Sequence, residues 1–336
     1  MKQGPKNLIT DVPGLKVGNA HNAHFKTGTT VLLPDEPITA SVAIHGGAPG
    51  TRDAALLEPD HTLEKVDALV LSGGSAFGLD ASGGVQQWLK EQGRGLTIGS
   101  AQIPIVPGAI IFDLLNNGNK DWGPMPPYRD LAISACTNAD HDFTLGTCGA
   151  GYGATTARLK GGLGSASTVL ENGVTIGALV AVNSIGSPTM GDGRQFWAAP
   201  FEINDEFGGL GLPEKVTHST TKIRVKSIPL EPGANTTIAI IATDADLTKS
   251  ACKRLAIESH DGISRAIWPA HSPLDGDLVF AASTARVALK DPVADFLEVG
   301  AAAAATLSRA IARAVYEATT EENDILPTWT DFHPAG

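Results

Sequence analysis

The sequence predicts a single layered α/β domain, and three observations support this. The chain has 336 residues, of which 42% are hydrophobic, enough for one large core. Several apolar runs rich in Val, Ile and Ala are typical of strands, and two long stretches show helical spacing. Because strands and helices alternate without a long low-complexity linker, we expect one domain over residues 1–336.

The strands are expected where branched and small apolar residues follow one another. Most of these runs are apolar at consecutive positions, which indicates strands that are covered on both faces. Glycine is abundant, with 38 residues, and favours close backbone packing and tight turns. The expected strands are 66–73, 174–184, 237–244 and 278–284.

Helices are expected in three places. Apolar residues recur every four positions in 245–267 and again in 293–319, where the alanine block 301–305 predicts close approach to a neighbour. Earlier in the chain, the glycine turn of "SGGSAFGLD" leads into a helix expected over 76–92. The first N–H groups of that helix could receive a substrate carbonyl or carboxylate.

Charge and hydropathy exclude several classes of protein. The net charge is −11 and no Lys/Arg cluster occurs, so we expect no nucleic-acid partner. The first residues contain no apolar segment before a small-residue cleavage site, and no window of 18 apolar residues occurs. We therefore expect a cytoplasmic protein without a membrane partner.

Cysteine and histidine usage predicts neither a disulfide framework nor a metal site. Cys136, Cys148 and Cys252 are far apart and never form a C-x-x-C pair, so they are interpreted as small core residues. His260 and His271 occur singly, without metal-ligand spacing. No cofactor and no metal are expected.

Two glycine-rich motifs resemble known signatures and are rejected. "CGAGYGAT" loosely matches the dinucleotide fingerprint, but "LKGGLGSAS" follows where its helix should continue. In "SGGSAFGLD", Phe77 occupies the place of the second glycine of a serine nucleophile elbow. Neither a nicotinamide site nor that elbow is predicted.

The start of the expected strand 237–244 raises a chemical question. A polar, proline-containing segment, 211–235, is expected to be an exposed connection, with a turn at Pro232 and Gly233, and it ends directly before Thr236. Threonines are good strand starters, so the pattern has a purely structural interpretation. The chemical alternative is that Thr236 becomes a nucleophile when the bond before it is cut.

An acid pair precedes the last expected strand. Asp275 and Asp277 lie two residues apart in "LDGDLVF", so both side chains can point the same way. From spacing alone, a turn built on the Asp-Gly pair is the favoured interpretation. The alternative is a pair that exchanges protons beside a nucleophile, with mutual repulsion raising one pKa.

Taken together, the motifs resemble one family, the P1 or DmpA-like peptidases. This family includes L-aminopeptidase/D-esterases, β-aminopeptidases and nylon-oligomer hydrolases. The resemblance runs almost from end to end, through "ITDVPGLKVGNA", "TGTTVLLP", "GGAPGTRDAALLEP", "DALVLSGGSAFGLDASGGV", "GAGYGATTARLKGGLGSAS", "ALVAVNSIG", "NTTIAIIATDADLTK" and "SPLDGDLVFAAST".

The resemblance implies a four-layer αββα sandwich of the N-terminal-nucleophile hydrolase type, in which each chain cuts itself once. The implied scissile bond is Asn235–Thr236, giving fragments 1–235 and 236–336 with Thr236 as the nucleophile. The implied activity is hydrolysis of amide bonds in short peptides or peptide-like amides. The resemblance also implies a homotetramer of cut protomers.

Further site residues are carried over position by position. The resemblance gives Asn183 the role of stabilising the oxyanion, and Lys160 a role in lowering the pKa of the amine or orienting Thr236. An aspartate at both 275 and 277 looks more like the nylon-oligomer hydrolases than the β-aminopeptidases. Phe112 stands where several relatives have a tyrosine, so substrate preference is not carried over.

Two other functions remain open at this point. A non-catalytic small-molecule binder on the same fold would not cut itself and would give one band on a denaturing gel. An acyltransferase would use the same nucleophile and would differ only in its products.

Overall fold

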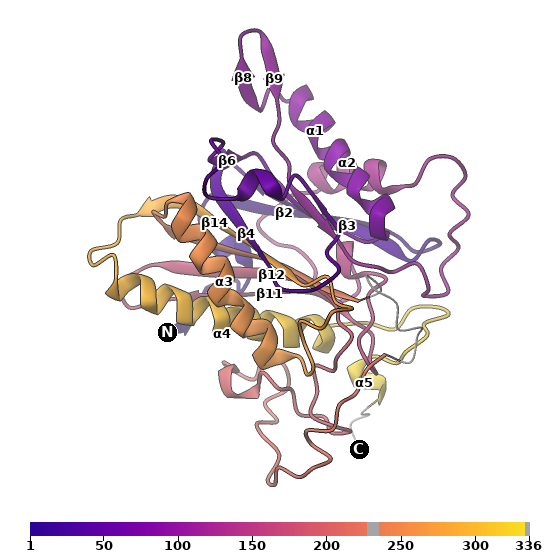
Figure 1. The fold of residues 1–336 in the computed structure, drawn as a ribbon. Coiled ribbons are helices and arrows are strands. Elements are labelled where there is room, and N and C mark those ends of the chain that lie inside the picture. Colours follow the sequence, from indigo (N-terminus) through magenta and orange to yellow (C-terminus); the bar gives the residue numbers. More distant parts are fainter. Residues whose placement is uncertain (227–234, 333–336) are drawn as a thin grey trace.

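The computed structural model describes residues 1–226 and 235–332, which form four layers (Figure 1). Two β-sheets pack face to face. Helices α1 (Ala81–Glu91) and α2 (Tyr128–Thr137) cover the outer face of the smaller sheet, and α3 (Lys249–Ala266) and α4 (Ala294–Tyr316) cover that of the larger sheet. The αββα sandwich is thereby confirmed.

The larger sheet has the strand order β1-β11-β12-β13-β14-β4-β6. At its centre, β13 is antiparallel to β12 and parallel to β14. Its strands are β1 (Lys2–Gln3), β11 (Gly162–Val169), β12 (Thr175–Asn183), β13 (Thr236–Ala245), β14 (Leu278–Val287), β4 (Ile38–Ile44) and β6 (Lys65–Val66).

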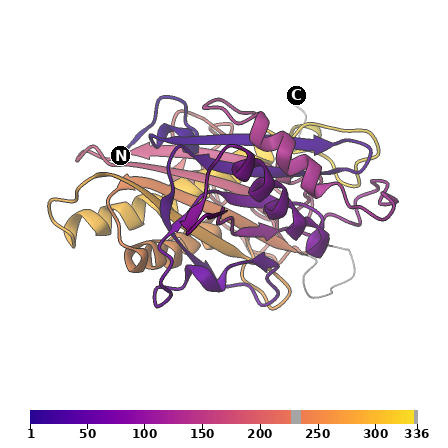
Figure 2. The same ribbon diagram turned by 90° about the horizontal axis from the view of Figure 1, so that it is seen from above.

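The smaller sheet has the order β2-β3-β7-β10-β5 and lies between the larger sheet and helices α1 and α2, as Figure 2 shows from above. A separate hairpin, β8 (Leu96–Ile98) with β9 (Ala101–Ile103), extends from the end of α1. The five strands are β2 (Leu15–Asn22), β3 (Thr27–Pro34), β7 (Leu69–Ser72), β10 (Gly108–Ile110) and β5 (Thr51–Arg52).

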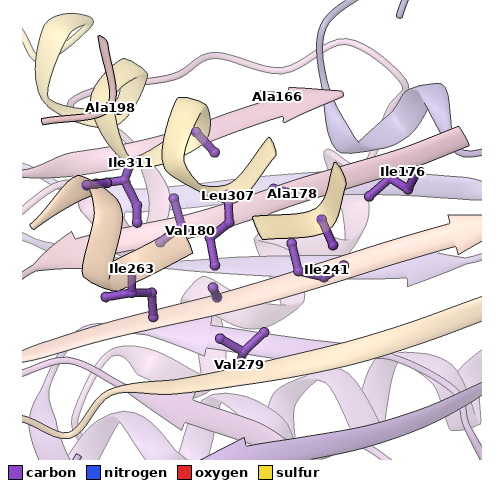
Figure 3. Close-up of a cluster of buried hydrophobic side chains, with 14 of the residues drawn as sticks. Ala166, Ile176, Ala178, Val180, Ala198, Ile241, Ile263, Val279, Leu307 and Ile311 are labelled. Carbon is purple, nitrogen blue, oxygen red and sulfur yellow. The ribbon is translucent and has the colours of Figure 1, made fainter. Parts of the chain in front are cut away.

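Strands β12, β13 and β14 are apolar on both faces because each face meets a different layer. In β13, Ala239 and Ile241 pack against the helices, whereas Ile238 and Ile240 pack against the second sheet. Figure 3 shows the helix-side cluster, in which Val180 and Ile241 of the sheet share one layer with Ile263 of α3 and Leu307 of α4. The expectation of doubly covered strands is confirmed for β12, β13 and β14, which match the expected strands 174–184, 237–244 and 278–284 closely. The expected strand 66–73 is shorter, because β7 covers only Leu69–Ser72 and Val66 belongs to β6 of the other sheet.

The helix expected over 76–92 is shorter than expected. A 3-10 helix, Ser75–Asp80, comes first, and α1 starts only at Ala81. The tight winding brings Gly78 against Gly73, where an added Cβ would lie 1.8 Å from the Gly73 carbonyl oxygen. Gly73 and Gly78, two of the glycines from which the turn was predicted, therefore pack against each other within that turn.

The connection 211–235 is described only up to residue 226. Most of 211–225 is exposed, in agreement with expectation, whereas Lys226 is buried. The turn expected at Pro232 and Gly233 lies outside the described residues. The three cysteines are buried and unpaired, as expected: Cys136, Cys148 and Cys252. None of the helices in the described ranges is long and apolar enough to cross a membrane.

Candidate active site

The proposed nucleophile lies at the start of β13, in the middle of the larger sheet. Thr236 is 1% exposed and pairs with Asn183 of β12 across the antiparallel register. Because side chains alternate along a strand, Thr236 faces the second sheet with Ile238, and Thr237 faces the helices. The two neighbouring hydroxyls therefore lie on opposite sides of the sheet.

The Thr236 hydroxyl lies beside the peptide bond that precedes it. Its Oγ1 is 2.5 Å from the Asn235 carbonyl oxygen, which also accepts a 2.8 Å hydrogen bond from the Gly276 backbone N–H. Gly276 has no room for a side chain, since an added Cβ would lie 2.8 Å from Thr236 Oγ1. A hydroxyl and an oxyanion donor thus meet at one carbonyl group.

Asp275 is buried directly before this donor. Its carboxylate accepts hydrogen bonds from Ser272 Oγ at 2.6 Å, Ser272 N at 2.9 Å and Ile185 N at 3.3 Å. Burial, and then the negative charge of Asp277, raise the pKa of Asp275 above its ordinary value. The negative charge of Asp277 is thus near enough to disfavour the charged form of Asp275.

Asp277 reaches the backbone of the nucleophile strand. Its Oδ1 accepts a 2.7 Å hydrogen bond from Thr237 N, and its Oδ2 lies 2.9 Å from Nδ1 of His271. Within residues 1–226 and 235–332, no hydrogen bond joins Thr236 Oγ1 to either carboxylate. Asp277 therefore holds Thr236 through the peptide that follows it.

A glycine loop after β4 fixes the two acids from the other side. The backbone N–H groups of His45 and Gly46 donate to the Asp277 carbonyl oxygen, and that of Ala48 donates to the Asp275 carbonyl oxygen. An added Cβ on Gly46 would lie 2.3 Å from Asp277 N. Only a glycine allows the loop to approach this closely.

Asn183 is fully buried, and its amide group is oriented by three partners. Oδ1 accepts from Thr155 N and from Lys226 Nζ, each at 3.0 Å, while Nδ2 donates to the Phe112 carbonyl oxygen at 2.9 Å. Phe112, which stands where several relatives have a tyrosine, thus contacts the site through its backbone. The Asn235 carbonyl oxygen accepts a hydrogen bond from Gly276 N–H, whereas the Asn183 amide N–H lies on Phe112.

Lys226 is a site residue that sequence reasoning missed. Its Nζ also lies 3.0 Å from the Asn183 carbonyl oxygen. Burial lowers the pKa of Lys226 to about 7, although the charge of Asp275 opposes this shift. The amine is therefore neutral in a large fraction of molecules near neutral pH. Nothing in the sequence distinguishes Lys226 from the other lysines of its polar segment.

Lys160, in contrast, is turned toward other partners. Its Nζ forms a 2.6 Å ion pair with Asp324, which also binds Lys26 at 2.7 Å. The backbone of Lys160 forms an isolated β-bridge with Thr155, the residue whose N–H donates to Asn183. Lys160 is thus linked to Asn183 through Thr155. Among the described residues, the lysine that touches Asn183 is Lys226.

Three histidines from distant segments meet beside Asp277. The rings of His45 and His260 stack at 3.7 Å and 17°, and those of His260 and His271 are 4.7 Å apart. Their nearest nitrogens lie within 4.8 Å of one another. However, the rings of His45 and His260 are nearly parallel. Their lone pairs lie in the ring planes and therefore do not point at one common position, as ligation of a shared metal ion requires. Sequence spacing could not reveal this cluster.

Comparisons with known proteins identify relatives along almost the whole chain. The family model for peptidase family S58 matches residues 7–324. An uncharacterized aminopeptidase of Mycobacterium tuberculosis is 41% identical, with 98% of each chain covered. The 6-aminohexanoate-oligomer endohydrolase of a Kocuria species is 27% identical over 85% of this chain and 77% of its own.

Solved structures share the fold. The L-aminopeptidase D-Ala-esterase/amidase of Ochrobactrum anthropi superposes with a TM-score of 0.71 at 22% identity, covering 98% of this chain and 93% of that one. A Burkholderia sp. β-aminopeptidase gives 0.70 at 21% identity, with 98% and 94% covered. The resemblance seen in the motifs is thereby confirmed: the chain belongs to peptidase family S58 and is a hydrolase that acts on amide bonds.

Proposed function

We propose that this hydrolase activates itself by cutting the Asn235–Thr236 bond and then uses Thr236 as an N-terminal nucleophile. The products of the cut are fragments 1–235 and 236–336. The observation that supports this most directly is the contact of Thr236 Oγ1 with the Asn235 carbonyl oxygen, on which the Gly276 N–H already lies. No other hydroxyl is needed for the scheme.

The cut proceeds in two steps. Thr236 Oγ1 loses its proton and attacks the Asn235 carbonyl carbon, and Gly276 N–H stabilises the oxyanion that forms. The C–N bond then breaks, the Thr236 nitrogen takes up the proton that Oγ1 released, and an ester joins Asn235 to Thr236. Water hydrolyses this ester, leaving a carboxylate on Asn235 and a free α-amine on Thr236.

The new amine supplies the base for later turnovers. An α-amine has a pKa of about 7.7–8.0, so a useful fraction is unprotonated near neutral pH and can accept the proton of its own hydroxyl. The Asn235 carbonyl marks where the acyl group of a substrate would lie. We assign oxyanion donation to Gly276 N–H, and to Asn183 once its side chain is released from Phe112.

The proposed substrates are short peptides or peptide-like amides. Relatives named as aminopeptidases and as 6-aminohexanoate-oligomer endohydrolases support this class. The paired aspartates favour the second group. We also propose, from the family resemblance, a homotetramer of cut protomers in the cytoplasm. Light scattering of the purified protein measures the assembly directly.

Intact-mass measurement and N-terminal sequencing test the cut. We expect wild type to give two fragments, the second starting at Thr236, and Thr236→Ala to give a single inactive 34.7 kDa chain. Thr236→Ser keeps a hydroxyl and should still cut. Thr237→Val is the matched control and should cut normally, because its hydroxyl faces the helices. A mature chain starting at Thr237, or an uncut active wild type, would contradict the proposal.

A substrate panel tests the second half of the proposal. The purified, cut enzyme is offered amino-acid p-nitroanilides, β-amino acyl amides and 6-aminohexanoate oligomers. We expect turnover of at least one class, with Thr236→Ala as the blank. Hydrolysis that persists in Thr236→Ala would assign the activity to a different nucleophile.

A further inference from the structure

His271 connects the Asp277 carboxylate to a buried histidine. Its ring Nδ1 lies 2.9 Å and its backbone N 3.1 Å from Asp277 Oδ2. On the other side of the ring, Nε2 lies 3.3 Å from Nδ1 of His260, and Nε2 of His260 lies 3.0 Å from the Ala43 carbonyl oxygen. These contacts form a continuous chain from α3 to the nucleophile strand.

The number of protons in this chain follows from its acceptors. The Ala43 carbonyl can only accept, so His260 carries its proton on Nε2 when neutral, and its Nδ1 is bare. His271 must then place a proton on Nε2 to donate to His260. The contact of His271 Nδ1 with Asp277 needs a second proton, which makes the pair an imidazolium and a carboxylate.

We propose that His271 is a positioning residue. It is an imidazolium that donates hydrogen bonds to His260 and to Asp277, and it thereby keeps Asp277 Oδ1 within hydrogen-bond distance of the Thr237 N–H. The inference rests on the proposed function, because the residue it positions through Asp277 is Thr236. His271 itself does not touch the reacting atoms. Its role is to keep the Asp277 carboxylate oriented, so that the Asn235–Thr236 bond stays beside Gly276.

The surroundings favour this charge state. The side chain of Asp277 is 2% exposed and that of His271 is 17% exposed, so solvent screens the pair weakly. Burial alone would lower the pKa of His271, but the hydrogen bond and charge of Asp277 outweigh it and raise the pKa above its ordinary value. Burial lowers the pKa of His260 to about 3, so that ring stays neutral.

Other ionisable groups near His271 come from the same cluster. His45 stands at right angles to it, at 5.5 Å between ring centroids, and burial followed by the charge of His271 lowers the pKa of His45. Asp275 adds a second negative charge that favours the imidazolium. We therefore expect self-cutting to slow as the pH rises through the raised pKa of His271, when the imidazolium loses its charge.

The first test measures the rate of self-cutting against pH, by intact mass after cell-free synthesis. His271→Asn keeps one donor near Asp277 but no charge, and we expect it to cut about 10- to 100-fold more slowly, the effect of losing a charge-assisted hydrogen bond. The alkaline fall in rate should disappear with it. His61→Asn is the matched control, since His61 forms an exposed 3.1 Å pair with Asp60 and should cut normally.

A double-mutant cycle separates positioning from general loss of structure. If His271 acts through Asp277, then His271→Asn should slow cutting little further in an Asp277→Asn background. Equal slowing in both backgrounds would overturn the inference. Circular dichroism of each variant shows whether the chain is folded before its rate is compared.

A second readout does not depend on cutting at all. Nitrogen-15 spectra of the uncut Thr236→Ala chain near neutral pH should show both ring nitrogens of His271 protonated, and only Nε2 of His260. A neutral His271 overturns the inference, and so does stoichiometric Zn²⁺ binding that His271→Asn abolishes, because the cluster would then be a metal site. An imidazolium in a wild type that never cuts would instead locate the failure in the proposed function.

Discussion

The buried guanidinium of Arg309 and the buried polar groups around Thr236 differ in how completely they are paired. Arg309 of α4 is 1% exposed. Its guanidinium donates hydrogen bonds to the side chains of Glu206 and Asn7. It also donates to two acceptors on β11, the Ser167 carbonyl oxygen and Thr168 Oγ1. Every guanidinium N–H of Arg309 has an acceptor. This cluster ties the N-terminal segment to α4 and to β11.

The cluster around Thr236 is less complete. In the described part of the chain, the side-chain oxygens of Asn235 and Thr237 are buried without a hydrogen-bond partner. Lys226 and Asp275 have shifted pKa values in the same space. A buried charge with a purely structural role needs a hydrogen-bond partner for every polar atom. Polar atoms that exchange hydrogen-bond partners during a reaction must instead have some of their hydrogen-bonding positions free. The contrast supports the proposal that the second cluster is the reactive one.

Breaking the saturated cluster should give the largest effect. Arg309→Met removes the guanidinium hydrogen bonds to Glu206, Asn7 and β11 and leaves the buried Glu206 with Arg313, 3.9 Å away, as its remaining ion-pair partner. We expect the free energy of unfolding to fall by about 3–5 kcal/mol. Urea denaturation measures this. Arg254→Met is the control, because Arg254 forms an exposed pair with Glu258 and should cost at most about 0.5 kcal/mol. Similar losses in both variants would remove the distinction.

Asn183→Ala tests the reactive cluster through its turnover. One lost oxyanion donor costs roughly 2.7–4 kcal/mol of transition-state stabilisation, about 10²- to 10³-fold in kcat. The variant also leaves Thr155 N and Lys226 Nζ without their acceptor, so its unfolding is measured in parallel. If activity falls only in proportion to the folded fraction, Asn183 has a purely structural role.

Lys226 should make stability depend on pH. The unfolded chain keeps its proton up to the ordinary pKa of 10.5, whereas the folded chain loses it near 7, so stability rises with pH between these values. The expected slope is up to about 1.4 kcal/mol per pH unit. In an uncut Thr236→Ala background, Lys226→Met should flatten this part of the curve. If the stability curves with and without Lys226→Met run parallel against pH, the pKa of Lys226 is not lowered by folding.

The smallest expected effect concerns Thr237. Its hydroxyl is buried without a partner, so Thr237→Val should raise the free energy of unfolding by about 1 kcal/mol. Thr306→Val is the matched control, since the hydroxyl of Thr306 donates to the Ala302 carbonyl oxygen at 2.7 Å, and that variant should lose about as much. Thermal denaturation compares the two. A loss in both would mean that Thr237 has a partner.

Local pattern was enough to predict the strands but not their neighbours. The apolar run 237–244 corresponds closely to β13, because a doubly covered strand has an unmistakable composition. The pairing of Asn183 with Thr236 depends on a long-range register that no local pattern contains. The family resemblance, rather than periodicity, predicted the sandwich and this pair of residues.

The other residues of the site could not be predicted from the sequence, for different physical reasons. Gly276 contributes a backbone N–H, which leaves no side-chain signature in a sequence. Lys226 acquires its lowered pKa only from burial, and burial is a property of the folded chain. His45, His260 and His271 come from three distant segments, so their meeting depends on the packing of α3 over β4 and β14.

The strand order has a further consequence for a chain cut before Thr236. Strands β13 and β14 of residues 236–336 would lie between β12 and β4 of residues 1–235, joined to both by backbone hydrogen bonds. The products would stay together as an interleaved heterodimer. Unfolding would then release two molecules from one, so the melting temperature of the mature protein would rise with its concentration, whereas that of uncut Thr236→Ala would not.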